Sequence, residues 1–79
     1  MNSRDRKKLC LLIKNTLQLE SEEGIELLSK SNCPKWDSLA QMSLVAVLEN
    51  EFSISIEIDD FEKLTSFASI KLMLEEKGT

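Results

Sequence analysis

Apolar residues recur at helical spacing in three separate stretches of this chain, and this periodicity constrains its fold more than any other feature. Residues three and four apart lie on the same face of a helix, so each stretch predicts a helix with one apolar side. The repeating positions are Leu9, Leu12, Ile13, Thr16 and Leu17 in the first stretch, Gln41, Leu44, Val45, Leu48 and Phe52 in the second, and Phe67, Ile70 and Leu74 in the third. Three helices whose apolar sides must be covered predict a helical bundle.

The length of the chain limits that bundle to a single core. A chain of 79 residues buries roughly 60–65% of its unfolded surface, which allows one compact core but no deep cleft between layers. We therefore expect an all-α fold, a small four-helix bundle with three main helices and one short helix, in a single domain of residues 1–79. The alternating isoleucines of residues 53–58 imitate a strand, but a lone strand has no partner, so we interpret them as an extended connection that buries alternate side chains.

Capping residues set the expected helix boundaries. Side-chain oxygens at a helix start accept hydrogen bonds from free backbone N–H groups, and glycine favours a helix end. The expected boundaries are Ser3 to about Gln18 for the first helix, about Ser38 to Phe52 for the second, Asp59 to about Leu64 for the short third helix, and Thr65 or Ser66 to Gly78 for the last.

Residues 19–36 are the least regular part of the sequence. Serine, glutamate, glycine, asparagine and proline are scattered through this segment, as is typical of a loop. We expect Ile25, Leu27 and Leu28 to attach it to the core. Leu11 falls nearly opposite the apolar side of the first helix, so we expect its side chain to be exposed.

The charge of the chain is negative overall and unevenly distributed. The net charge is −4; the first 36 residues carry seven basic and five acidic side chains, and the remaining 43 carry three and nine. A nucleic-acid binder would normally show a basic working face. The basic cluster of residues 4–8 is interrupted by Asp5, and we interpret it as the solvated start of a helix. We expect no nucleic-acid partner.

The longest uncharged apolar run is Leu9 to Ile13. Five residues are too few for a membrane span or for the apolar part of a signal peptide. We therefore expect a cytoplasmic monomer without membrane insertion.

Histidine is absent, and the two cysteines do not form a CxxC pair. These absences remove most zinc sites and every histidine-based catalytic triad. No catalytic base stands beside a nucleophile, so we expect no enzyme and no metal. We interpret Cys10 and Cys33 as two reduced cysteines, the first at the edge of the core and the second in a loop.

The second helix has apolar residues on two sides. Leu39, Met42 and Ala46 fall almost opposite its core face, with Glu49 and Ser43 beside them. A small bundle seldom buries both sides of one helix, so this stripe is a candidate docking surface. The pattern is equally compatible with a stripe that the irregular loop covers.

The start of the same helix carries a hydroxyl group on Ser38. Either Ser38 or Asp37 could cap the helix by accepting a backbone hydrogen bond. The alternative role of Ser38 is to carry a phosphate, because free N–H groups and the positive end of the helix dipole favour an anion there. Taken alone, the sequence Asp-Ser-Leu indicates no more than a cap.

The surrounding residues strengthen the second interpretation, because the chain resembles the acyl carrier protein family. That family has Asp-Ser-Leu at the start of its second helix, followed by an apolar-rich helix that ends in acidic residues and an aromatic. The matching features are the run Trp36-Asp37-Ser38-Leu39, the helix to Phe52, Ile54 and Ile56 in the connection, Asp59 to Leu64 as a short helix, and Thr65-Ser66-Phe67 at the start of the last. The resemblance extends over residues 36–74, is weaker over Leu9 to Leu19, and is poor over residues 20–35.

The resemblance implies a function and a site. Ser38 would receive 4′-phosphopantetheine covalently from coenzyme A, with Asp37 and Leu39 completing the attachment site. Leu39, Met42 and Ala46 would contact partner enzymes, with Glu49 and Glu51 as acidic contacts. These would be a phosphopantetheinyl transferase, an acyl- or aminoacyl-loading enzyme and a downstream transferase. The thiol of the arm would hold the cargo as a thioester, and the isoleucine-rich connection would either line a cavity for a long acyl chain or pack into the core.

Two departures from the family pattern point to a specialised carrier. Ala40 and Ser43 stand where typical fatty-acid carriers have acidic residues. Electrostatic matching governs encounter between such partners, so losing two acids should weaken recognition by general fatty-acid enzymes. The alternative function is a helical adaptor that binds a partner protein through the same stripe without any arm.

Overall fold

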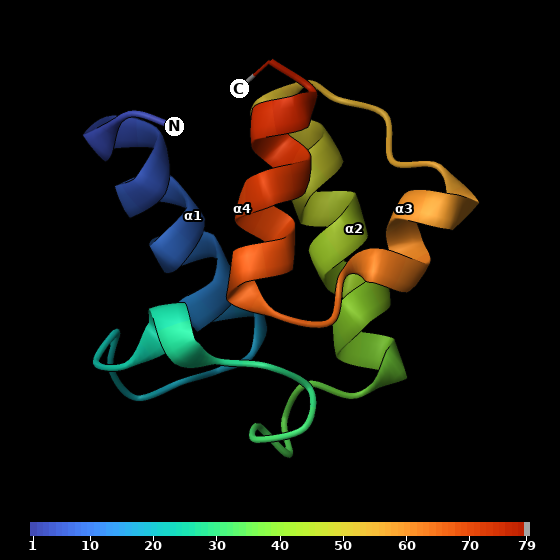
Figure 1. Cartoon of the computed structure of the whole chain (residues 1–79). Helices are drawn as coiled ribbons and strands as arrows, with labels where there is room; N and C mark the ends of the chain where they lie inside the picture. The colour runs from blue at the N-terminus through green and yellow to red at the C-terminus, as the bar shows by residue number, and fades with distance from the viewer. Residues whose placement is uncertain (79) are drawn as a thin grey trace.

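The computed structural model describes residues 1–78 and contains four α-helices and one short 3-10 helix (Figure 1). Apart from an isolated bridge between Ser29 and Ser66, these residues form no β-structure. Over the same range, no helix has the combination of length and apolar character that crossing a bilayer requires. The elements are α1 (Ser3–Thr16), η1 (Ile25–Leu27), α2 (Ser38–Phe52), α3 (Ile58–Lys63) and α4 (Phe67–Glu76). The expected all-α bundle of three main helices and one short helix is confirmed.

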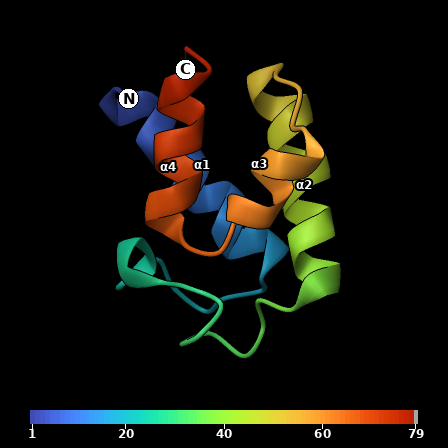
Figure 2. The same ribbon diagram turned by 45° about the vertical axis from the view of Figure 1, so that its right-hand side comes forward.

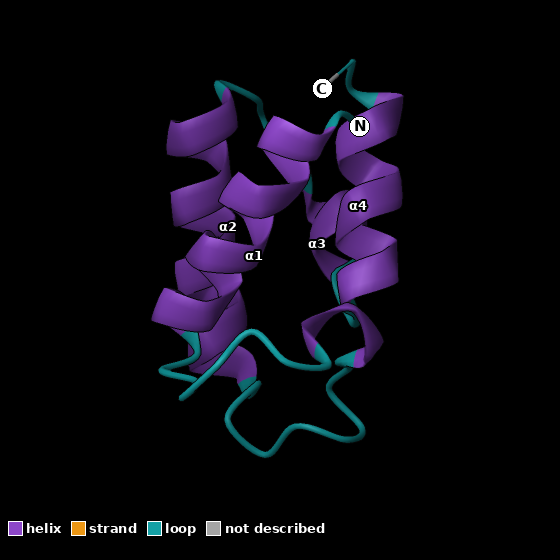
Figure 3. Ribbon diagram, turned by 90° about the vertical axis from the view of Figure 1, so that its left-hand side faces the viewer, coloured by secondary structure: helices purple, strands orange, loops and turns teal. Residues whose placement is uncertain are grey.

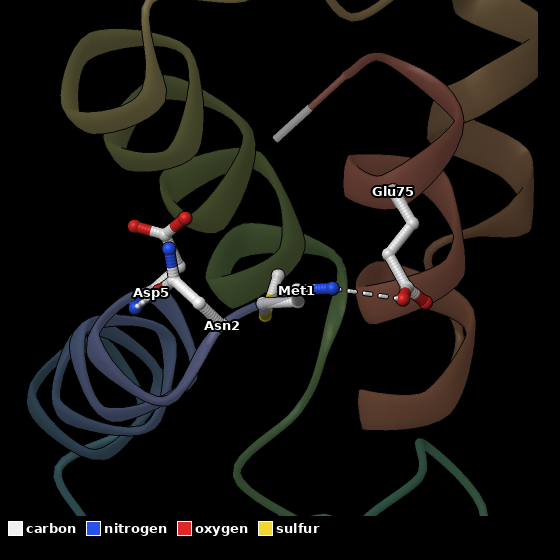
Figure 4. Close-up of polar contacts among 4 residues, drawn as sticks. All are labelled: Met1, Asn2, Asp5 and Glu75. Atoms are coloured by element: carbon white, nitrogen blue, oxygen red, sulfur yellow. Dashed lines mark hydrogen bonds and ion pairs between the residues drawn. The ribbon is translucent and has the colours of Figure 1, made fainter.

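The three main helices enclose the core, and the short helix α3 lies on the outside beside α2 (Figures 1 and 2). The long segment between α1 and α2 runs across one end of the bundle, which is the end where α2 begins (Figures 1 and 3). Both termini lie at the opposite end. There the amino group of Met1 is 3.1 Å from a carboxylate oxygen of Glu75 on α4 (Figure 4).

The core contains the apolar positions that the helical periodicity predicts. Each main helix contributes fully buried side chains, and residues 17–37 add Ile25, Cys33 and Trp36. The buried side chains with no exposed surface are Leu9 and Ile13 from α1, Leu44 and Leu48 from α2, Leu64, and Ile70 and Leu74 from α4. Leu11, on the opposite side of α1, is half exposed as expected. Burial of these side chains supplies most of the driving force for folding.

The expected cap is wrong at α1 and confirmed at α4. Helix α1 is capped by Asn2, whose Oδ1 accepts a hydrogen bond from the backbone N–H of Asp5 at 2.8 Å, and Ser3 is already helical. Asparagine is as good an N-cap as serine, so a cap one residue earlier adds a residue to the helix. At α4, the expected cap is confirmed, because Ser66 Oγ accepts from the N–H of Ser69 at 3.1 Å.

The start of α3 also differs from the expectation. The helix begins at Ile58 rather than after Asp59, and the Asp60 carboxylate accepts a hydrogen bond from the N–H of Glu57 at 3.3 Å. The chain turns into a helix at Ile58, and its side chain is 80% exposed. The expectation that alternate isoleucines are buried therefore holds for Ile54 and Ile56, which pack against the core, and fails for Ile58.

The segment between α1 and α2 is more ordered than its composition indicates. It contains the 3-10 helix η1, which was not predicted, and Asn32 organises the turn that follows by bonding to Leu27 O and to Ser29 N–H. Ile25 and Leu28 attach the segment to the core, but Leu27 is 80% exposed. The expectation for Leu27 is wrong because a 3-10 helix repeats every three residues, so Leu28 shares the side of Ile25 and Leu27 does not.

An ion pair joins α3 to Lys77, the residue that follows α4. Lys77 Nζ lies 3.0 Å from Asp60 Oδ2, and both side chains are about three-quarters buried. The hydrogen bond from Lys77, followed by the one from the Glu57 N–H, lowers the pKa of Asp60 below its ordinary value of 3.8. A carboxyl whose pKa is lower in the folded state adds stability above the unfolded pKa, and that stability is lost as the pH falls through the folded pKa.

Asp60→Asn is therefore expected to be less stable than the native chain at neutral pH, and the difference should shrink and then vanish as the pH falls through the lowered pKa of Asp60. Urea unfolding of both proteins across this range measures it. A difference in unfolding free energy that does not change with pH would contradict the role of the charged pair.

Candidate functional site

The start of α2 leaves the hydroxyl group of Ser38 free. Asp37 is the N-cap, with extended backbone, and its Oδ1 accepts a hydrogen bond from the N–H of Ala40 at 2.8 Å. Ser38 is exposed, and its Oγ makes no hydrogen bond to any residue in the described part of the chain. The sequence left the capping role open between the two residues, and the structure assigns it to Asp37.

At the start of α2, two backbone N–H groups have no acceptor among the described residues. The first N–H groups of a helix have no acceptor within it, and here the N–H of Ala40 is used by Asp37 and that of Gln41 by the Asp37 carbonyl at 2.9 Å. The N–H groups of Ser38 and Leu39 accordingly remain open at the positive end of a 15-residue helix. A phosphodiester on the hydroxyl would lie where such a dipole favours negative charge.

Trp36 fixes the chain immediately before this site. Its side chain is 2% exposed, and its backbone N–H donates to Cys33 O at 3.0 Å. The indole Nε1 lies buried without a hydrogen-bond partner among residues 1–78. Sequence reasoning treated Trp36 only as part of the family resemblance. The sequence signal that could have indicated this anchoring role was a large aromatic residue two positions before Ser38.

The apolar stripe on α2 is exposed. Leu39 and Met42 are 76% and 61% exposed, and Ala46 is also exposed, whereas Leu44 and Leu48 on the other side have no exposed surface. The loop therefore does not cover the stripe. Of the two interpretations that the pattern allowed, the one in which the loop buries these residues is wrong. We refer to Leu39, Met42 and Ala46 together as the docking face. This face lies on the same helix as Ser38 and begins at Leu39, the residue that follows it.

Glu49 is placed differently from the rest of the expected contact set. Its side chain is half-buried, and Oε2 accepts a hydrogen bond from the backbone N–H of Ile56 at 2.8 Å. Its backbone carbonyl accepts from the N–H of Ile54 at 3.2 Å. Glu49 therefore holds the connection between α2 and α3, a contact that the sequence did not indicate. Its role in partner binding stays a prediction.

Gln41 forms a second link between α2 and α3. Among residues 1–78 it is the one buried polar side chain, with 3% of its surface exposed. Nε2 donates to the backbone carbonyl of Phe61 at 2.7 Å, and Oε1 has no partner in the same range. The helical spacing placed Gln41 correctly on the core face but did not indicate this contact.

Both cysteine thiols are shielded from solvent. Cys10 is 7% and Cys33 5% exposed, and neither is in a disulfide. Burial raises the pKa of the Cys10 thiol, which keeps it protonated at neutral pH. Cys10 lines a cavity of about 550 Å³ between α1 and η1, so it lies at the core edge, and Cys33 lies in the loop, as expected.

Two isoleucines of the connection, Ile54 and Ile56, pack against the core. A second cavity, of about 260 Å³, lies between α3 and α4, and neither cavity is lined by Ile54, Ile56 or Ser38. Ile54 and Ile56 are partly buried against the core cluster. Residues 1–78 contain no group of three or more His, Cys, Asp or Glu side chains that could hold a metal ion.

The fold and the site define a class: a small four-helix bundle that presents a free serine hydroxyl at the start of α2, beside an exposed apolar face. The chain is similar to acyl carrier protein 4, chloroplastic, of Cuphea lanceolata, with 31% identity over 75 residues that cover 90% of this chain and 54% of that protein. It is a distant homologue that spans about half of that relative's length. No family model matches the chain. No solved structure matches it.

Proposed function

We propose that this chain is an acyl carrier protein that holds an acyl or aminoacyl group on a 4′-phosphopantetheine arm attached to Ser38. The observation that carries the proposal is the exposed Ser38 hydroxyl, which Asp37 releases from capping at the start of a helix with an exposed apolar face. The similarity to an acyl carrier protein over 90% of the chain supports it. The protein would act as a carrier, and its partner enzymes would perform the chemistry.

The residues of the site fit a phosphodiester and its substituent. Ser38 Oγ is the attachment atom, and the open N–H groups of Ser38 and Leu39 would stabilise the negative charge. Asp37 holds the helix start in place and would assist the transferase, while buried Trp36 keeps the preceding segment rigid. When attached, the arm supplies a thiol that carries the cargo as a thioester.

The docking face would serve the phosphopantetheinyl transferase, the loading enzyme and the downstream transferase in turn. Ala40 and Ser43, in place of the acids of fatty-acid carriers, support a dedicated pathway rather than general fatty-acid synthesis. The cytoplasmic location, the monomeric state and the single carrier domain stay predictions of the sequence.

The buried cysteines offer a direct test of the arm. We expect the native chain to show no fast-reacting thiol toward dithiobis-nitrobenzoate, because both cysteines are buried and the pKa of Cys10 is raised. After incubation with coenzyme A and a broad-specificity phosphopantetheinyl transferase, followed by removal of small molecules, one fast thiol per chain should appear. The unfolded chain, which exposes both cysteines, calibrates the assay.

The absence of a new fast thiol, in a folded chain and with a transferase that modifies a reference carrier, would count against the proposal. The same result would favour an adaptor that binds its partner through the docking face alone.

A further inference from the structure

Helix α3 is held in place by polar contacts and, at its C-terminal end, by the fully buried side chain of Leu64. Its six residues include no buried side chain. Its attachment to the bundle relies on the Gln41 amide, which bonds to Phe61 O, and on the ion pair between Asp60 and Lys77. The third attachment is the connection that leads into it from α2. A short helix without buried side chains depends strongly on such contacts for its position.

Glu49 is the principal anchor of that connection. Its carbonyl accepts from Ile54 N–H and its carboxylate from Ile56 N–H, so one residue of α2 binds two alternate residues of the connection. The second bond is charge-assisted and only 2.8 Å long, which places it among the stronger hydrogen bonds of this type. Ile56 stands two residues before α3, so this bond holds the chain that enters α3 against α2.

The same contacts leave the docking face without a free carboxylate. The acids of α2 are Glu49, which binds the connection, and Glu51, whose carboxylate lies 3.7 Å from Lys8 Nζ. Asp37, just before the helix, is occupied as its cap. An acid that recognises a basic partner needs its carboxylate in solvent before the encounter. Within the described residues, the carboxylates of Glu49 and Asp37 accept backbone hydrogen bonds, and Glu51, although exposed, pairs with Lys8 of α1.

We infer that Glu49 is a positioning residue for carrier recognition, which fixes α3 beside the docking face, rather than an acidic contact for the partner enzyme. The inference rests on the proposed function of the docking face. If Glu49 has this role, the transferase contacts an apolar surface on α2. Its binding to the docking face then depends on how α3 is positioned beside α2.

Two variants of Glu49, with side chains of similar length, distinguish a positioning residue from an acidic contact. Glu49→Gln removes the charge and keeps an oxygen that accepts the Ile56 N–H bond, whereas Glu49→Met removes both. Both residues are good helix formers, so α2 itself should be unaffected. Glu23→Gln, at an exposed acid in the segment between α1 and α2, serves as the matched control for loss of one negative charge.

Amide hydrogen exchange gives a readout that needs no activity. In Glu49→Met the protection of the Ile56 amide should fall about tenfold, while Glu49→Gln stays near the native value. The Leu48 amide in the core should keep its protection in every variant, which distinguishes local release of the connection from unfolding. Unchanged Ile56 protection in Glu49→Met would overturn the inference.

Transferase kinetics give the functional readout. With coenzyme A and the broad-specificity transferase, the KM for the carrier should rise about five- to tenfold in Glu49→Met, with kcat little changed, and stay near native in Glu49→Gln and Glu23→Gln. If both Glu49 variants raise KM equally while the Ile56 amide stays protected, Glu49 is a docking charge and the inference is wrong. If the native chain is not modified at all, the proposed function fails, and the exchange comparison still decides whether Glu49 holds the connection.

Discussion

Ser38→Ala is expected to abolish attachment of the arm while leaving the fold intact. The hydroxyl oxygen is the only atom at this position that could form the phosphodiester, so the loss should be complete. Stability should change by less than about 0.5 kcal/mol, because the side chain is exposed and Asp37 performs the capping. Transfer from a fluorescent coenzyme A analogue measures attachment, and thermal unfolding followed by circular dichroism measures stability.

Ser43→Ala provides the matched control for this experiment. Ser43 is also exposed and lies on the same helix, but it is not at the helix start. Its variant should be labelled at the native rate. Labelling that persists in Ser38→Ala, or that is lost equally in Ser43→Ala, would exclude Ser38 as the attachment site.

Trp36→Ala is expected to bring the chain close to unfolding. Removing a fully buried tryptophan typically costs about 3–5 kcal/mol, and a domain this small lies near the lower end of the usual 5–15 kcal/mol range. Trp36 is 2% exposed and holds the long segment against the core just before Ser38. Urea unfolding followed by circular dichroism should show a large fall in the midpoint, or no folded baseline at all.

Two further variants make the Trp36 prediction specific. Trp36→Phe keeps most of the apolar contact and removes an N–H that has no partner in the described chain, so it should cost only about 1–2 kcal/mol. Leu27→Ala, at a leucine that is 80% exposed, should change stability by less than about 0.5 kcal/mol. Equal midpoints for Trp36→Ala and Leu27→Ala would show that Trp36 does not anchor the core.

The helices could be predicted from the sequence because their signals are local. Helix α2 runs from Ser38 to Phe52 as expected, and its core face carries the residues that helical spacing assigns to it. The Ser66 cap of α4 was likewise predictable, since a cap depends on the residue and the three that follow it. Where two neighbouring residues cap equally well, as Asn2 and Ser3 do, the predicted helix start can be wrong by one residue.

The segment between α1 and α2 was poorly predicted because its structure depends on distant contacts. Its position is determined by backbone hydrogen bonds that join Lys30 to Thr65 and Phe67 to Leu28, across more than thirty residues of sequence. The three-residue helix η1 is too short for a periodic signal, and it begins after Gly24, whose φ of 72° lies in the left-handed region that glycine favours. The exposure of Leu27 follows from that turn.

At the candidate site, the sequence identified the residues but not their contacts. Asp37 and Ser38 could each cap α2 from their positions in the chain, and the backbone geometry assigns the cap to Asp37. The role of Glu49 depends on the path of the connection after α2, which returns Ile56 to its carboxylate. Helical spacing places a residue on a face, but it does not show which other segment comes back to meet it.

The most direct test of the carrier function is the intact mass of the native chain before and after incubation with coenzyme A and a broad-specificity phosphopantetheinyl transferase. Our account predicts a gain of one phosphopantetheine group, which fragmentation should locate on Ser38. An unchanged mass, in a folded chain and with a transferase that modifies a reference carrier in the same mixture, would contradict the carrier function. The docking face would then be the binding surface of an unmodified adaptor.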